Sequence, residues 1–162
     1  MKLKRLAVPR SLAMVLVIVT ALVGPARAGD PGLRHEGASY RVYLGVTPAW
    51  RLEQMPELVD RDKHLHGGLA REMNTQHVTA AIFDRRGNRV SDATVIAELS
   101  HRRWTHPARL VRPLERMTVG GVITYGNFFR MAERGEYQIV LHIYSTAGDQ
   151  PEVARFVYRR PD

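Results

Sequence analysis

Apolar and polar residues alternate with a period of two in several segments of this chain. The clearest is Tyr137–Ser145, in which Tyr137, Ile139, Leu141 and Ile143 share one face of an extended strand. Similar segments lie at 39–47, 77–84, 89–99 and 152–159, and weaker ones that contain Pro or Gly lie at 108–117 and 122–131. About seven such segments, separated by turn signals and without a convincing helix, predict an all-β fold.

The turn between the second and third segments points to a particular kind of sandwich. It reads Arg85-Arg86-Gly87-Asn88, in which the last two residues tolerate positive φ angles. The surrounding pattern, Asp84-x-x-Gly87-x-x-Val90-x-x-Ala93-x-Val95, is typical of a hairpin in immunoglobulin-like modules. We therefore predict an immunoglobulin-like β-sandwich of about seven strands. Segment 50–63 is predicted to be a loop, with at most a short helical turn near 57–60, because Pro56 interrupts it.

The first 28 residues have the three parts of a secretory signal peptide. A basic start (Lys2, Lys4, Arg5 and Arg10) precedes an apolar run from Leu12 to Gly24 and the small-x-small sequence Ala26-Arg27-Ala28. The alternative, an uncleaved membrane anchor, is disfavoured because the apolar run is short for a membrane span. We predict a periplasmic protein with a signal peptide at 1–28, a flexible leader at 29–38 and one domain at 39–162.

Charge and cysteine content narrow the function classes. The predicted signal carries five of the 24 basic residues and none of the 16 acidic ones, which leaves 19 against 16 and a net charge of +3. This small excess does not predict nucleic-acid binding. The chain has no Cys, so the core or a ligand must stabilise the domain without disulfides. No catalytic motif such as G-x-S-x-G, H-E-x-x-H or a Cys nucleophile is present, and we predict that the protein is not an enzyme.

Histidine and methionine side chains provide candidate metal ligands. His64, His66 and Met73 precede the second segment, His77 opens it, and Met117 ends a later one. Imidazole binds Cu, Zn, Ni and Fe, and thioether favours Cu(I). The alternative is that the loop histidines are solvated and the methionines fill the core. The other histidines, His35, His101, His106 and His142, are expected at the surface.

Part of the chain resembles a known family. The segment from Met117 to Asn127 (MTVGGVITYGN) and the segment from Arg134 to Ile143 (RGEYQIVLHI) are similar to periplasmic iron-transport accessory proteins that bind copper beside an inner-membrane iron permease. The family has an immunoglobulin-like sandwich, is usually dimeric, and carries a Met, six residues, then His-Tyr-Gly. Another strand there begins with His followed two positions later by Glu.

The resemblance implies Met117 as the thioether ligand and His77 as the strand-initial imidazole. Two positions depart from the family pattern, since Thr124 replaces the second His and Thr79 replaces Glu. His64 or His66 are the candidates to complete a site from the loop.

Two hypotheses follow. The first is a periplasmic protein that captures and transfers copper or iron through His77, Met117 and His66 or His64, with a permease or another envelope protein as partner and a homodimer as its expected assembly. The second is a metal-free sandwich that binds an envelope protein, in which Tyr125, Gly126 and Asn127 are structural: Tyr packs, Gly permits a bend and Asn bonds the backbone. Convergence of His66, His77 and Met117 would favour the first.

Overall fold

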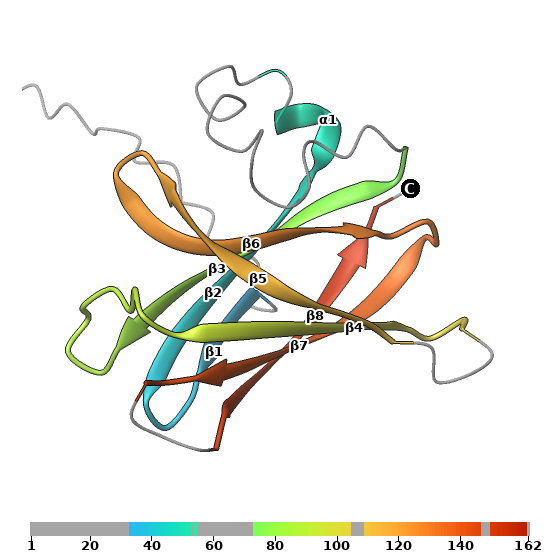
Figure 1. Ribbon diagram of the computed structural model, residues 1–162. Helices are drawn as coiled ribbons and strands as arrows, with labels where there is room; N and C mark the ends of the chain where they lie inside the picture. The colour runs from blue at the N-terminus through green and yellow to red at the C-terminus, as the bar shows by residue number, and fades with distance from the viewer. Residues whose placement is uncertain (1–32, 53, 55–72, 105–108, 147–149, 162) are drawn as a thin grey trace, which may run out of the picture.

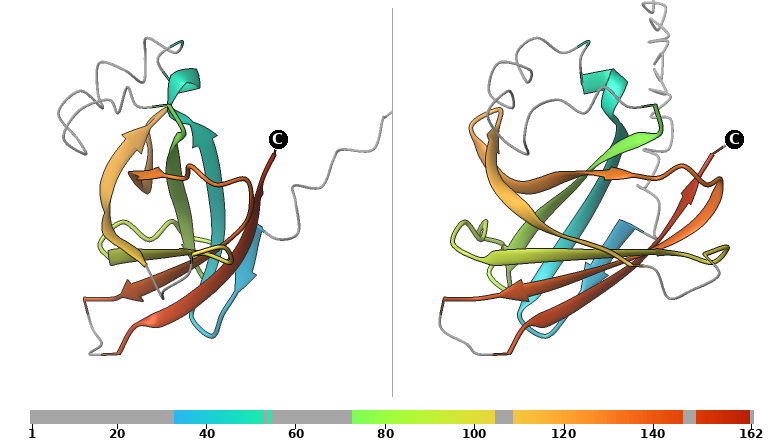
Figure 2. Two further views of the ribbon diagram at one scale, coloured as in Figure 1. Left: turned by 90° about the vertical axis from the view of Figure 1, so that its right-hand side faces the viewer. Right: turned by 45° about the vertical axis from the view of Figure 1, so that its right-hand side comes forward.

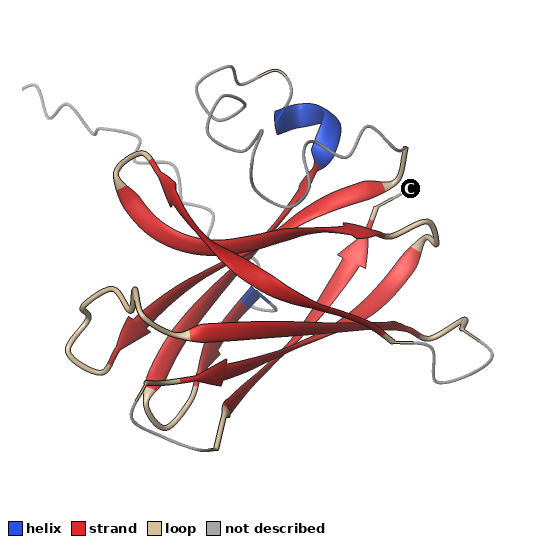
Figure 3. Ribbon diagram, in the orientation of Figure 1, coloured by secondary structure: helices blue, strands red, loops and turns tan. Residues whose placement is uncertain are grey.

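The computed structural model describes residues 33–161 except 53, 55–72, 105–108 and 147–149. Almost all regular structure in these ranges is β-strand (Figure 3). The strands are β1 (Arg34–Glu36), β2 (Tyr40–Pro48), β3 (Thr75–Asp84), β4 (Thr94–His101), β5 (Leu110–Val119), β6 (Val122–Arg130), β7 (Gly135–Tyr144) and β8 (Glu152–Arg160), and α1 (Ala49–Leu52) is a single helical turn. No helix within these ranges has the length and apolar character needed to cross a bilayer.

The all-β prediction is confirmed, and each predicted segment overlaps a strand. The strands form one antiparallel sheet in the order β1-β2-β3-β6-β5-β4-β7-β8. β5 joins two groups of strands, because Leu110–Leu114 pairs with β4 and Glu115–Val119 pairs with β6. β5 thus crosses from one layer to the other (Figure 1). The sheet curls so that the two groups face each other (Figure 2).

The outer strands of the sheet, β1 and β8, come together and nearly close it into a barrel. The carboxylate of Glu152 accepts hydrogen bonds from the backbone N–H groups of Ser39 (2.7 Å) and Tyr40 (3.1 Å). A Cβ atom on Gly37 would collide with that carboxylate, so a larger residue there would displace the Glu152 side chain. The edge of the His35 ring also packs against Phe156, with the ring centroids 6.0 Å apart.

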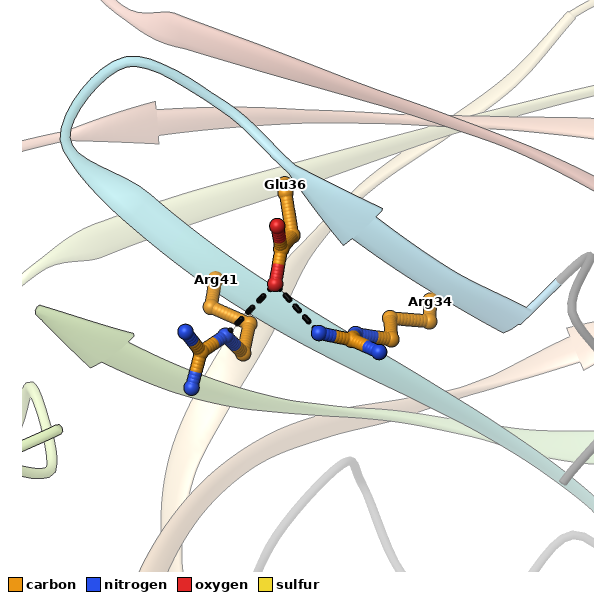
Figure 4. Close-up of polar contacts among 3 residues, drawn as sticks. All are labelled: Arg34, Glu36 and Arg41. Carbon is orange, nitrogen blue, oxygen red and sulfur yellow. Dashed lines mark hydrogen bonds and ion pairs between the residues drawn. The ribbon is translucent and has the colours of Figure 1, made fainter. Parts of the chain in front are cut away.

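An exposed ion cluster fastens β1 to β2 in the same region (Figure 4). Glu36 Oε1 accepts hydrogen bonds from Arg34 Nη2 and, at 2.9 Å, from Arg41 Nε. These bonds from Arg34 and then Arg41 hold the pKa of Glu36 below its usual value, because they stabilise the ionised carboxylate. β1 lies within residues 29–38, the segment for which the sequence predicts a leader.

The core lies between the two groups of strands, as the alternation predicts. All four predicted inward residues of β7 are buried, and so are their neighbours on β4. These core residues are Tyr137, Ile139, Leu141, Ile143, Val95, Ala97 and Leu99. Burial of the Val, Leu and Ile side chains among them stabilises the fold by about 1.5–3 kcal/mol each.

The expectation that His101 lies at the surface is wrong, since only 6% of the residue is exposed. It follows Val95, Ala97 and Leu99 on the inward side of β4. Its Nδ1 accepts from the backbone N–H of Arg103 at 3.1 Å, and its Nε2 lies 3.1 Å from the carbonyl oxygen of Arg134. Both ring nitrogens are therefore satisfied by backbone, which explains how a polar ring is tolerated there.

Candidate metal centre

His77 lies on the outer side of β3, opposite the main core. Val78, Ala80 and Ile82 point into the core, and the alternation places His77 and Thr79 on the other side. His77 is nevertheless only 3% exposed. Its ring stacks at a tilt on Phe128, its partner on β6, with centroids 4.7 Å apart. The imidazole is thus fixed at a covered position on the outside of the sheet.

Met117 reaches the same place from β5. It is 5% exposed and is paired in register with Thr124 on β6. A Cβ atom built on Gly126 would lie 2.8 Å from His77 Nε2 and 2.8 Å from Met117 Sδ. The two donor atoms can therefore be no further apart than twice that distance. Gly126 leaves open the space into which both side chains point.

These residues line a pocket of about 310 Å³. α1 and the tip of the β5–β6 hairpin lie at the same end of the molecule (Figure 2), and both contribute lining residues to the pocket. The described residues that line it are Thr47, Leu52, His77, Thr79, Ala81, Arg89, Met117, Val119, Val122 and Thr124. All four positions singled out by the family resemblance, two retained and two replaced, are therefore in one pocket.

The two replacement threonines differ in how their hydroxyl groups are used. Thr124 Oγ1 donates to the carbonyl oxygen of Ala80 at 2.9 Å. Thr79 Oγ1 reaches the carbonyl oxygen of Gly45 only at 3.5 Å, a long and weak contact. Neither supplies the imidazole or carboxylate that the family pattern has there, so the pocket is poorer in strong metal ligands.

The remaining predicted ligands are not brought to this pocket by the described structure. His64 and His66 lie outside the described residues. Met73 is 88% exposed and does not line the pocket. Within the described ranges, no group of three or more His, Cys, Asp or Glu side chains could hold a metal ion.

The structural interpretation of Tyr125-Gly126-Asn127 is correct for the first and last residues. The buried Tyr125 hydroxyl accepts from Ala93 N–H at 3.1 Å and donates to the Val90 carbonyl at 3.3 Å. Asn127 donates to the Pro113 carbonyl at 2.7 Å and accepts from the Phe128 N–H at 2.7 Å. Gly126 has a different role from the expected bend, because it gives clearance to His77 and Met117.

Sequence reasoning missed Arg89 as a pocket residue. It follows the β3–β4 turn, and the sequence predicts it only as the first residue of the strand segment 89–99. The sequence signal for its position is the predicted turn, which places Arg89 opposite Phe83. The two residues form an isolated antiparallel bridge on the outer side of the sheet.

No family model and no curated protein sequence matches the chain. Solved structures do match. Copper-reconstituted P19 from Campylobacter jejuni matches with a TM-score of 0.59 and 13% identity, over 80% of this chain and 95% of that chain. Copper-bound FetP of uropathogenic Escherichia coli, a variant, matches with a TM-score of 0.58 and 13% identity over 78% and 93%.

The chain is similar in fold to P19 and FetP. A DUF4426 family protein from Pseudomonas aeruginosa is also similar, with a TM-score of 0.56 and 17% identity over 80% of this chain and 94% of that chain. The resemblance noted in the sequence is therefore confirmed at the level of the fold. At these identities the likeness does not extend to ligands.

Proposed function

We propose that this protein is a periplasmic metal-binding protein that handles copper, or iron, in association with iron transport. It would capture the ion and pass it to an inner-membrane permease or another envelope protein without chemical turnover. The observation that carries the proposal is the convergence of His77 Nε2 and Met117 Sδ on the space above Gly126. The copper-bound state of similar structures supports copper as the first candidate.

The chemistry of the donors fits copper better than the harder ions. Imidazole and thioether together are ligands for Cu(I), whereas Mg²⁺, Ca²⁺ and Mn²⁺ prefer carboxylate and carbonyl oxygens. The walls of the pocket also include the apolar side chains of Leu52, Val119 and Val122. Two protein donors leave coordination positions open, and we propose His66 or His64 to fill one of them.

A metal titration of the mature protein from Gly29, prepared without a His tag, tests this function. Cu(I), Cu(II), Zn(II) and Fe(II) are added separately while thermal unfolding is followed. A ligand that binds only the folded state stabilises it by about 2.7 kcal/mol at a hundredfold excess over Kd. We expect a clear upward shift of Tm with copper.

The double variant His77→Gln with Met117→Leu should lose that shift, because both donors are removed while side-chain volume is nearly kept. A matched control combines His142→Gln on β7 with Met131→Leu in the core, which removes the same two residue types elsewhere. An equal shift in the double variant and in the wild type would rule out this site. No shift with any of the metals would rule out the function.

The second candidate function, a metal-free module that binds an envelope protein, is favoured by one observation. Threonine stands at both positions where the family pattern has a further metal ligand, and both threonines line the pocket. This candidate predicts no metal-dependent change in Tm. It also predicts that the double variant and its control behave alike in every metal titration.

For the architecture we infer an immunoglobulin-like sandwich with β1 added at one edge. Without β1, the pairing gives β2-β3-β6-β5 in one layer and β4-β7-β8 in the other, the order of a constant-type immunoglobulin domain. The Tyr137 hydroxyl bonds the backbone N–H and carbonyl of Glu133, both at 3.0 Å, as in a tyrosine corner. A crystal structure of the mature chain with a different strand order would overturn this assignment.

A further inference from the structure

Arg89 is the only charged side chain among the described residues that line the pocket. Its guanidinium carbon lies 4.2 Å from the centre of the Phe83 ring, which supports it from one side. Its Nη1 atom is buried and has no hydrogen-bond partner. Within the described part of the chain, no hydrogen bond or ion pair to Arg89 is found.

This situation differs from that of Arg109 and Arg112. Arg109 pairs with Glu98 at 2.8 Å, and Arg112 donates to the carbonyl oxygen of Phe128 at 3.0 Å. A guanidinium is always charged, so Arg89 cannot avoid the cost of partial burial by losing its proton. An anion in the pocket would offset that cost, because the planar fork of Arg fits a carboxylate or phosphate with two parallel hydrogen bonds.

Two threonine hydroxyl groups in the pocket are able to donate to the same anion. Thr47 makes no side-chain hydrogen bond to any described residue, and Thr79 makes only its long contact of 3.5 Å with Gly45. Thr124 is different, since its hydroxyl hydrogen is already given to Ala80. No carboxylate is among the described lining residues to repel an anion.

We propose that the pocket binds a small oxyanion, a carboxylate or a phosphate, held by Arg89 with Thr47 and Thr79. The volume of about 310 Å³ is at the lower end of the range for ligand pockets, which favours a small anion. The anion lies beside His77 and Met117 and so becomes a companion ligand for the captured metal, in place of the carboxylate lost at Thr79. This last role rests on the proposed function, whereas anion binding to the metal-free protein does not.

The first experiment uses the mature protein freed of metal with a chelator and then dialysed. Acetate, malonate and inorganic phosphate are titrated separately at constant ionic strength, with binding followed by calorimetry and by the NMR signals of Arg89 and Thr79. We expect saturable binding of at least one of these anions at one site. The comparison of malonate with phosphate identifies which class of oxyanion the pocket takes.

Variants locate the site. Arg89→Met should weaken anion binding at least tenfold, and Arg89→Lys, which keeps the charge but loses the fork, should weaken it several-fold. Arg155→Met on β8 is the control, because it removes an exposed arginine that lines no part of this pocket.

Equal binding by Arg89→Met and wild type, or an equal loss in Arg155→Met, would overturn the proposal, and so would the absence of saturable binding by all three anions. If Arg89→Met does not fold, Arg89→Lys is used in its place. An anion affinity of Arg89→Lys equal to that of the wild type would then overturn the proposal.

A second experiment separates this inference from the metal function. Cu(I) affinity is measured with and without the anion that binds, and we expect the anion to raise it several-fold in the wild type but not in Arg89→Met. If the protein binds the anion but no metal, the proposed oxyanion site stands and the proposed metal function is overturned. Metal binding with no anion bound to either form keeps the metal function and overturns the oxyanion site.

Discussion

Gly126 is the residue on which the geometry of the candidate site depends. Its missing side chain leaves the space that His77 Nε2 and Met117 Sδ approach, each 2.8 Å from where a Cβ would lie. Gly126→Ala should therefore push both donors apart and lower metal affinity at least tenfold. The added methyl group should also destabilise the fold by about 1–3 kcal/mol, as overpacking does. Metal titration and urea unfolding of the same variant measure the two effects.

Gly135→Ala is the matched control for that variant. Gly135 has a φ angle of +107° at the start of β7, so alanine is strained there and costs about 1–3 kcal/mol. It lines no part of the pocket. Metal affinity should stay at the wild-type value in this control despite the loss of stability. A parallel loss of affinity in both variants would show that the effect of Gly126→Ala is only one of stability.

The residues of the candidate site could be predicted from sequence only in part. The family resemblance pointed to His77 and Met117, and the structure brings them together. The clearance role of Gly126 depends on a diagonal relation between three strands, which no local pattern contains. For Arg89, the predicted turn already places the residue opposite Phe83, but the pocket that it lines is built by strands distant in sequence, which no local pattern shows.

At the scale of elements, the period-two alternation is sufficient to locate all of the described strands except β1. It also contained the signal for His101, which continues the inward series of β4, but the charged residues after it suggested a loop. β1 could not be predicted, because its three residues are positioned by other elements. They pair with β2, and His35 packs against Phe156, which is distant in sequence. α1 is a single helical turn that overlaps the segment 50–63, for which the sequence predicts a loop.

Glu152 fastens the β1–β2 hairpin to β8 through the backbone of Ser39 and Tyr40. Hydrogen bonds to a charged group contribute about 1.5–3 kcal/mol, so Glu152→Gln should lower the free energy of unfolding by about that amount at most. Hydrogen exchange of the β1 and β2 amides should accelerate more than that of the β7 amides. Glu136→Gln on β7 is the control, because that residue is exposed and far from the hairpin. Equal protection of β1 in both variants would contradict the role of Glu152 in closing the sheet.

For the whole molecule, three tyrosines make the free energy of unfolding vary with pH in the alkaline range. Burial is the main cause that raises the pKa of Tyr125, Tyr137 and Tyr158 above the ordinary value of 10.0. The unfolded chain then loses these protons at a lower pH than the folded chain does. Their stabilising contribution is complete below about pH 10 and is lost as pH rises through the folded-state values.

Urea unfolding at several pH values from 8 to 11.5 should show a free energy of unfolding that falls above about pH 10. Tyr125→Phe should lower stability by about 1 kcal/mol at pH 8, because the hydroxyl bonds to Val90 and Ala93 are lost. The decrease above pH 10 should then be shallower than in the wild type, since one buried titrating group is gone. Tyr43→Phe, at a position that is 40% exposed, is the control and should follow the wild-type curve. A Tyr125→Phe curve parallel to the wild type would show that burial of this hydroxyl does not couple the core to alkaline unfolding.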